Sequence, residues 1–265
     1  MSRTGERFFF RMNGTYDVLI AVHLAEGVMT WPWLAFGFAV AAGLLVWSSG
    51  NLDHREIPRI ALLSAAFFVA SLIHVRVGPS SVHLILNGLL GVILGRRAIL
   101  AISVGLFLQA ILLGHGGLST LGLNISIMSI PALLARSLFF KLEAATPTGF
   151  HFTPCGVVAV LTLLWSAFIG LAAVAPLIAR RRGRSIEHQQ FVHSGFVIGG
   201  FAVVLTTVLN AAVLLLGGNE NWSTVAVFVL LAHVPIAFLE GLITGGVVGF
   251  LMRVRPELFS TKTDT

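Results

Sequence analysis

The sequence predicts an all-α protein that crosses a membrane several times, and two observations support this. Of the 265 residues, 56% are hydrophobic and only 11% are charged, whereas a soluble domain spends about a quarter of its residues on charge. The apolar residues also gather in runs that approach the roughly 20 residues a helix needs to cross a bilayer. No alternating ten-residue pattern and no long polar block occurs, which disfavours a β-barrel and an appended soluble domain.

Eight apolar runs, each bounded by charged or turn residues, are the candidate helices, although some are shorter than a crossing. They cover residues 28–47, 60–75, 82–95, 98–114, 121–135, 156–178, 191–216 and 223–252. We expect a single transmembrane domain over 22–256. An extension over 1–21 precedes it and a polar tail over 257–265 follows it.

The run 28–47 predicts a full crossing that starts at the membrane surface. Trp31 and a second tryptophan lie at its beginning, where aromatic rings commonly meet the lipid headgroups. The following loop has mixed charge and holds His54, which we interpret as a solvated residue rather than a ligand. The next run, 60–75, is shorter and ends at His74.

A turn at 78–82 then leads into the run 82–95 and places His83 at the start of that helix. The run 98–114 follows a pair of arginines. It ends in a glycine-rich segment that contains His115, and so many glycines at a helix exit indicate tight backbone turns.

The remaining runs differ in how well they suit a crossing. The run 121–135 is short, bears serines and contains Pro131, whereas 156–178 is uncharged and is followed by a cluster of arginines. In 191–216 and 223–252, glycines recur four residues apart, a spacing that allows close helix packing within the chain or against a partner helix.

Orientation follows from the basic segments, which prefer the cytoplasm. For the three most basic segments to share that side, only one of 121–135 and 156–178 can cross. We assign the crossing to 156–178 and interpret 121–135 as re-entrant or packed. The result is about seven crossings, with His23 and His83 together on the extracytoplasmic side.

Several classes of function are excluded. The net charge of +6 does not indicate nucleic acid, because the basic residues sit in short loops beside apolar runs, where they orient a membrane protein. The only cysteine, Cys155, has no partner for a disulfide or a CxxC site. No HExxH, Walker or GxSxG motif occurs, so we expect no enzyme activity and no organic cofactor.

Several segments, taken in order, resemble the CbiM/NikM family, the substrate-binding membrane subunits of energy-coupling-factor (ECF) transporters for cobalt and nickel. The similarity covers about residues 22–142 and 191–256, and we can place no counterpart for 143–190. The segments are Val22-His23-Leu24-Ala25-Glu26-Gly27-Val28 with Trp31-Pro32-Trp33, Pro79-Ser80-Ser81-Val82-His83, Leu108-Gln109-Ala110 running to His115-Gly116-Gly117-Leu118-Ser119-Thr120-Leu121-Gly122-Leu123-Asn124, and Ala232-His233-Val234-Pro235 with Leu239-Glu240-Gly241.

The resemblance implies a metal site made of four nitrogens. They are the terminal amine of the chain, the amide nitrogen and imidazole of the histidine that follows it, and the imidazole of a second histidine. In this sequence they correspond to the amine of Val22, the amide nitrogen and the imidazole of His23, and the imidazole of His83. Such a set suits nickel(II) and related late divalent ions, and the amide must lose a proton to bind.

One departure affects this ligand set: Val22 is internal as written and has no free amine. Three explanations are open: translation starts at a GTG codon read here as Val22, a peptidase frees this residue, or another group replaces the donor. We favour the start codon, because no good cleavage signal precedes Val22.

Other polar residues are candidates for orienting the ligands without touching the ion. They are His74, Ser81, His115 and Asn124, and each is equally interpretable as an ordinary turn or capping residue. Glu240 is the acidic residue inside an apolar run, where ionisable groups are costly and usually functional. Its expected partner is His233, Arg136 or another subunit, rather than the metal.

The resemblance also implies partners: a transmembrane coupling subunit (CbiQ/NikQ-like), ATPase subunits (CbiO/NikO-like) and a small accessory membrane protein, all in the inner membrane of a bacterial cell. The cargo would be Co²⁺ or Ni²⁺, between which the sequence does not choose. A stand-alone proton-coupled transporter with Glu240 as proton carrier is the alternative. A membrane metalloenzyme is disfavoured, because no open ligand position and no general base are found.

Overall fold

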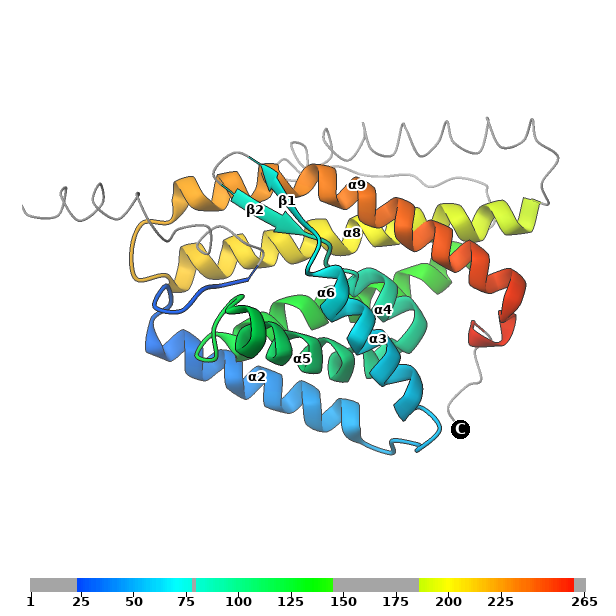
Figure 1. Cartoon of the computed structure of the whole chain (residues 1–265), viewed down its shortest axis with the longest axis horizontal. Coiled ribbons are helices and arrows are strands. Elements are labelled where there is room, and N and C mark those ends of the chain that lie inside the picture. Colours follow the sequence, from blue (N-terminus) through cyan, green and yellow to red (C-terminus); the bar gives the residue numbers. More distant parts are fainter. Residues whose placement is uncertain (1–22, 78–79, 145–185, 260–265) are drawn as a thin grey trace, which may run out of the picture.

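The computed structural model describes residues 23–77, 80–144 and 186–259, which form a helical bundle with a short β-hairpin (Figure 1). A 3-10 turn over Gly95–Arg97 joins α4 to α5, a π-helical turn over Gln109–Leu113 extends α5, and a 3-10 turn over Pro256–Leu258 follows α9. The helices and strands are α2 Trp31–Ser49, α3 Ile57–Ala70, β1 His74–Val77, β2 Ser80–His83, α4 Asn87–Leu94, α5 Ala98–Leu108, α6 Leu121–Ala144, α8 Ile186–Gly217 and α9 Ser223–Val254.

The long helices α8 and α9 run side by side in opposite directions (Figure 1). Glycines let their backbones meet: a Cβ on Gly195 would lie 2.9 Å from the Gly245 Cα, and one on Gly199 would lie 2.7 Å from the Glu240 carbonyl oxygen. The glycine spacing in these two runs therefore serves close contact between helices of the same chain.

Helix α2 lies on the side of the bundle opposite α8 and α9 (Figure 1). It crosses α6 at another close approach, since a Cβ on Gly122 would lie 2.6 Å from the Phe38 nitrogen. Large apolar side chains on its other faces, including Trp31, Phe36 and Trp47, are exposed. Such a surface is stable in lipid rather than in water.

A first correction concerns the run 121–135, which is not a short segment broken by proline but part of a longer helix. That it does not cross the membrane stays a prediction. Helix α6 is continuous over 24 residues, with Pro131 inside it, and it is long and apolar enough to cross a membrane. Its polar groups find partners within the protein: Ser126 Oγ donates to the Gly122 carbonyl one turn earlier (2.8 Å), and Asn87 Nδ2 donates to the Met128 carbonyl (3.1 Å). Internal pairing of this kind lets a helix keep proline and serine at membrane depth.

In the described part of the chain, five helical stretches are long and apolar enough to cross a membrane, and α3 is shorter. The run 156–178 lies outside the described residues, so the count of seven crossings stays a prediction. The five stretches are 31–49, 87–113, 121–143, 190–217 and 223–254.

A second correction concerns the region between α3 and α4, where the sequence predicted helix up to 75 and again from 82. Helix α3 ends at Ala70, and β1 pairs antiparallel with β2 so that His74 lies opposite His83. The fold is therefore helical apart from this hairpin. Valines recur at short spacing in this segment, and β-branched residues favour extended backbone.

The buried Arg97 joins the end of α2 to the start of α5. Its guanidinium donates to the carbonyls of Ser48, Gly50 (2.9 Å) and Asn51 (2.6 Å), and it pairs with Glu56 at 2.9 Å. A cation is favourable here, because the last carbonyls of a helix lack partners within the helix.

Gly91→Ala is expected to destabilise the protein, because a Cβ at Gly91 would overlap the Ala132 carbonyl where α4 meets α6. Overpacking of this kind costs about 1–3 kcal/mol. Gly43→Ala is the matched control, since nothing lies within 4 Å of a Cβ there. Thermal unfolding in detergent measures both, and an equal midpoint for the two variants would contradict the packing described.

Candidate metal centre

Residues 23–30 form an irregular segment ahead of α2 whose backbone groups need partners, because its surroundings are apolar. Asn124 supplies two: its Oδ1 accepts from the Leu24 N–H (2.9 Å) and its Nδ2 donates to the Leu24 carbonyl (3.1 Å). Thr120 Oγ1 donates to the same carbonyl at 2.7 Å. These bonds fix the backbone directly beside His23.

The far end of this segment is held by the loop between α8 and α9. The Thr30 N–H donates to the Gly217 carbonyl and the Asn219 N–H donates to the Val28 carbonyl, both at 3.0 Å. The Asn219 side chain also donates to the Gly27 carbonyl at 2.6 Å. The segment is thus tied to two loops that are distant from it in sequence.

The glycine-rich loop after α5 packs directly on this segment. Gly114 and Gly116 have positive φ angles of 64° and 73°, which glycine adopts without strain. A Cβ on Gly116 would lie 3.3 Å from the His23 Cβ, and the Ser119 N–H donates to Glu26 Oε1 at 3.1 Å. Tight turns at this helix exit, as the sequence predicted, let the loop approach His23.

Glu240 on α9 holds the chain just after His83. Its buried carboxylate accepts hydrogen bonds from the amides of Ile85 and Leu86, the latter at 2.9 and 3.0 Å. Leu86 has a positive φ of 53° and precedes the first turn of α4, where an anion is favourable. The hydrogen bonds described for Glu240 thus come from backbone amides, rather than from His233 or Arg136 as the sequence suggested.

Three histidine rings come together between these elements. His23 and His83 are only 3% and 1% exposed, and their rings stack with centroids 5.0 Å apart. The ring of His115 also stacks with the ring of His83, and their centroids are 6.2 Å apart. The structure thus brings His23, His83 and His115 together, and that they bind a metal stays a prediction.

The tautomer of His83 follows from its neighbour. His83 Nδ1 lies 2.8 Å from the Leu84 carbonyl oxygen, and a carbonyl only accepts, so Nδ1 carries the proton in the neutral ring. The lone pair then lies on Nε2. A backbone carbonyl on one imidazole nitrogen is the usual way in which proteins orient a metal-binding histidine.

Side chains alone do not complete a ligand set: within the described residues, no group of three or more His, Cys, Asp or Glu is arranged to hold a metal ion. The ligand set that the resemblance implies takes only the imidazoles of His23 and His83 from side chains, and its other two donors are backbone nitrogens. The residue that would supply the amine, Val22, lies outside the described residues.

Burial lowers the pKa of His23 well below its ordinary value of 6.5, and the nearby His83 and His115 lower it further. The imidazole is therefore neutral at physiological pH, the form that coordinates metals. Its ring nitrogens are buried and make no hydrogen bond of normal geometry in the described part of the protein.

Gln109 is a site residue to which the sequence assigned no role. It begins the π-helical turn after α5, its side chain is 0% exposed, and it lies close enough to His23 to oppose the fall in the pKa of that ring. Neither its amide nitrogen nor its oxygen makes a hydrogen bond of normal geometry within the described residues. A polar residue inside the apolar run 98–114 was the available sequence signal, whereas the π-turn, a feature common at functional sites, is visible only in the structure.

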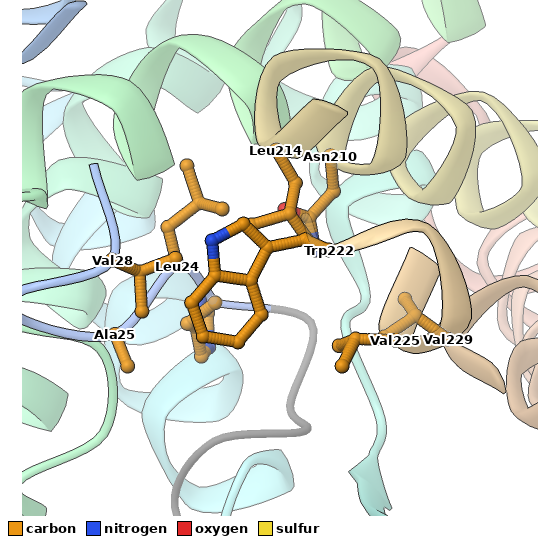
Figure 2. A pocket seen from close by; sticks show the side chains of 9 residues that line it. Leu24, Ala25, Val28, Asn210, Leu214, Trp222, Val225 and Val229 are labelled. Carbon is orange, nitrogen blue, oxygen red and sulfur yellow. The ribbon is translucent and has the colours of Figure 1, made fainter. Parts of the chain in front are cut away.

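A small cavity of about 20 Å³ reaches His23 from the loop between α8 and α9. Figure 2 shows Trp222 lying across this cavity, with Leu24 and Val28 on one side and Val229 on another. Asn210 on α8 completes its polar lining. The volume suffices for about one water molecule.

The remaining predicted residues are placed as follows. Asn124 lies beside His23, as described. His74 and Ser81 lie on the two strands of the hairpin, but their side chains lie outside what the structure describes. His54 is exposed in its loop, in agreement with the prediction that it is solvated.

Fold and site together define a class: a multi-pass helical membrane protein that buries a cluster of imidazoles among its irregular segments. The chain belongs to the CbiM family, described as the cobalt uptake substrate-specific transmembrane region, whose profile matches residues 23–176 and 164–258. The family consists of membrane components of transporters, so the chain is a transport component rather than an enzyme, as the sequence predicted.

Individual relatives agree with this family. A putative metal transport protein of Haemophilus influenzae is 30% identical over 90% of this chain and 97% of its own length. The cobalt transport protein CbiM of Sorangium cellulosum is 28% identical over 89% and 94%. A putative fused cobalt transport protein CbiMQ of Methanocorpusculum labreanum is 25% identical over 90% of this chain and 36% of its own.

The fold is also found in a crystal structure of a transition metal transporter. It aligns with a TM-score of 0.58 at 22% identity, over 88% of this chain and 93% of that one.

Asn124→Ala is expected to loosen the segment that carries His23. The Leu24 N–H loses its acceptor, and a buried amide without a partner costs about 1–3 kcal/mol. Hydrogen–deuterium exchange of the 23–30 region should rise. Asn219→Ala, which removes an exposed bond to the same segment, is the control and should have a smaller effect; the reverse order would contradict the role given to Asn124.

Acid is expected to destabilise the metal-free protein through His23. Its pKa in the folded chain lies well below 6.5. Below pH 6.5 the unfolded chain therefore binds a proton at this residue that the folded chain does not bind. This contribution is present above about pH 6.5 and is lost as the pH falls below it. Thermal unfolding measured against pH tests this, and the unfolding temperature of His23→Phe should fall less steeply with falling pH. An unchanged slope in this variant would exclude His23 as the cause.

Proposed function

We propose that this chain is the metal-capturing membrane subunit of an ECF-type transporter for Co²⁺ or Ni²⁺. The observation that carries this proposal is the stacked pair of buried imidazoles, His23 and His83, 5.0 Å apart between centroids. They lie where the N-terminal segment, the hairpin and the glycine-rich loop meet. Partner ATPase subunits then drive release on the other side of the membrane.

The chemistry of the donors supports a late first-row ion. His83 offers Nε2, since its Nδ1 proton is held by the Leu84 carbonyl, and His23 is neutral. Imidazole nitrogens suit cobalt, nickel and their neighbours, whereas magnesium prefers oxygen ligands. A deprotonated His23 amide would add one negative charge, which a divalent ion in an apolar environment requires.

The full ligand set requires a free amine at Val22, so we propose that the working chain begins there. The family match starts at His23, which supports this start. The terminal amine, the His23 amide and the two imidazoles would then supply four nitrogens. The affinity order of divalent ions favours nickel in such a set, and the family description favours cobalt.

The partners are a coupling subunit, ATPase subunits and a small accessory membrane protein. A relative in which the CbiM part is fused to a CbiQ part supports the coupling subunit. The sequence holds no phosphate-binding motif, which supports an ATPase supplied in trans.

His23→Ala and His83→Ala are each expected to abolish cobalt and nickel uptake while the protein still inserts in the membrane, because each removes a nitrogen ligand. The measurement is uptake by cells that express the chain with its partner subunits, together with the metal content and N-terminal mass of the purified chain. His54→Ala, an exposed loop histidine, is the control and should transport normally.

Two results would contradict the proposal. Uptake at the wild-type level in either variant would remove the assigned ligands. Uptake by the chain reconstituted alone, without an ATPase, would instead favour a proton-coupled transporter, in which Glu240 would have to release the amides of Ile85 and Leu86.

A further inference from the structure

His233 on α9 has the features of a second nitrogen ligand. It is only 2% exposed, and its Nδ1 lies 2.6 Å from the Val229 carbonyl. Because the carbonyl accepts, Nδ1 carries the proton and the lone pair lies on Nε2. That nitrogen is buried and has no hydrogen-bond partner among the described residues, although an unpaired polar atom in an apolar core is costly.

His233 lies close to the site already described. Val229, whose carbonyl oxygen lies beside His233 Nδ1, lines the same cavity as His23. Gln109, whose side-chain amide is also buried without a normal hydrogen bond, lies beside the same cluster, because its backbone carbonyl oxygen accepts from the His115 N–H at 3.2 Å. His233 and Gln109 are thus both neighbours of the histidine cluster.

The position of His233 along α9 gives a direction to the transfer of an ion from His23. The helix starts at Ser223, beside the loop that holds residues 27–30, and His233 lies ten residues further, about 15 Å along the axis. It is one turn beyond Val229, so an ion leaving His23 for His233 would move toward the other end of the bundle.

Helix α9 can also change shape at this level. Pro235 lies inside it and offers no N–H to the Leu231 carbonyl, and a helix commonly bends at such a point. Seven residues after His233, Glu240 holds the amides that follow His83. A bend of α9 would therefore move His233 and the His83 loop relative to each other.

We propose that His233 Nε2, with the Gln109 amide oxygen, forms a second binding station for the same divalent ion, which receives it from His23 and His83 during transport. This inference rests on the proposed function. A neutral imidazole and a neutral side-chain amide bind an ion more weakly than four nitrogens that include a deprotonated backbone amide. The second station therefore passes the ion on and does not trap it.

The test compares equilibrium binding with transport in the full chain. His233→Phe keeps an aromatic ring but removes both nitrogens, and His233→Gln keeps an amide that can accept the ion. Each is measured for Co²⁺ bound per purified chain and its Kd, for thermal unfolding, and for cobalt uptake in cells that also express the coupling and ATPase subunits. His193→Phe, a half-buried histidine of α8, is the matched control.

The expected result is a separation of binding from transport. His233→Phe should keep the bound ion, the Kd and the unfolding temperature, while uptake falls about ten-fold or more. His233→Gln should recover part of the uptake, and His193→Phe should transport normally. A merely structural role would lower the unfolding temperature or the occupancy.

Three results would overturn the inference. Wild-type uptake in His233→Phe would remove the second station. Loss of binding together with uptake, in both His233 variants, would make His233 part of the first site. A wild-type chain that binds no Co²⁺ would instead contradict the proposed function, and the inference with it.

Discussion

Every buried backbone amide and carbonyl in this protein must find a partner inside the protein, because lipid offers none. Helices meet this requirement by themselves, but residues 23–30 and the stretch from the hairpin to α4 do not. Side chains from distant helices therefore satisfy these backbone groups: Asn124 and Thr120 at Leu24, and Glu240 at Leu86. The position of His23 and His83, the two histidines proposed as metal ligands, depends on these few bonds.

The same requirement explains why the site lies where it does. Irregular backbone at membrane depth is tolerated only where it is enclosed by protein, and enclosure keeps the imidazole of His23 neutral by lowering its pKa. The helix contacts at Gly122 and Gly91 bring α6 close to α2 and α4. Within the described residues, the irregular segment 23–30 and the glycine-rich loop after α5 thus meet at the histidines, where the packed helices enclose them.

Much of the arrangement could be predicted from the sequence, because apolar runs mark helices and two histidines precede or begin such runs. The continuity of α6 could not, since Pro131 and its serines looked like a break, whereas the helix continues through the proline and Ser126 bonds back to the Gly122 carbonyl of the same helix. The hairpin at 74–83 was missed because a short apolar stretch has no clear period. Glu240 could be singled out as an acidic residue inside an apolar run, but its amide partners lie 154 and 155 residues away, and no local pattern reveals them.

The hydrogen bonds that hold the segment carrying His23 join parts of the chain that are synthesised far apart in time. Leu24 meets Asn124 across 100 residues, and Gly27 meets Asn219 across 192. During synthesis the first of these segments is made long before its partners, so it docks only after α8 and its following loop are inserted. Assembly of the site is therefore a late step in biogenesis, and an incompletely inserted chain lacks the pocket that would sequester an ion.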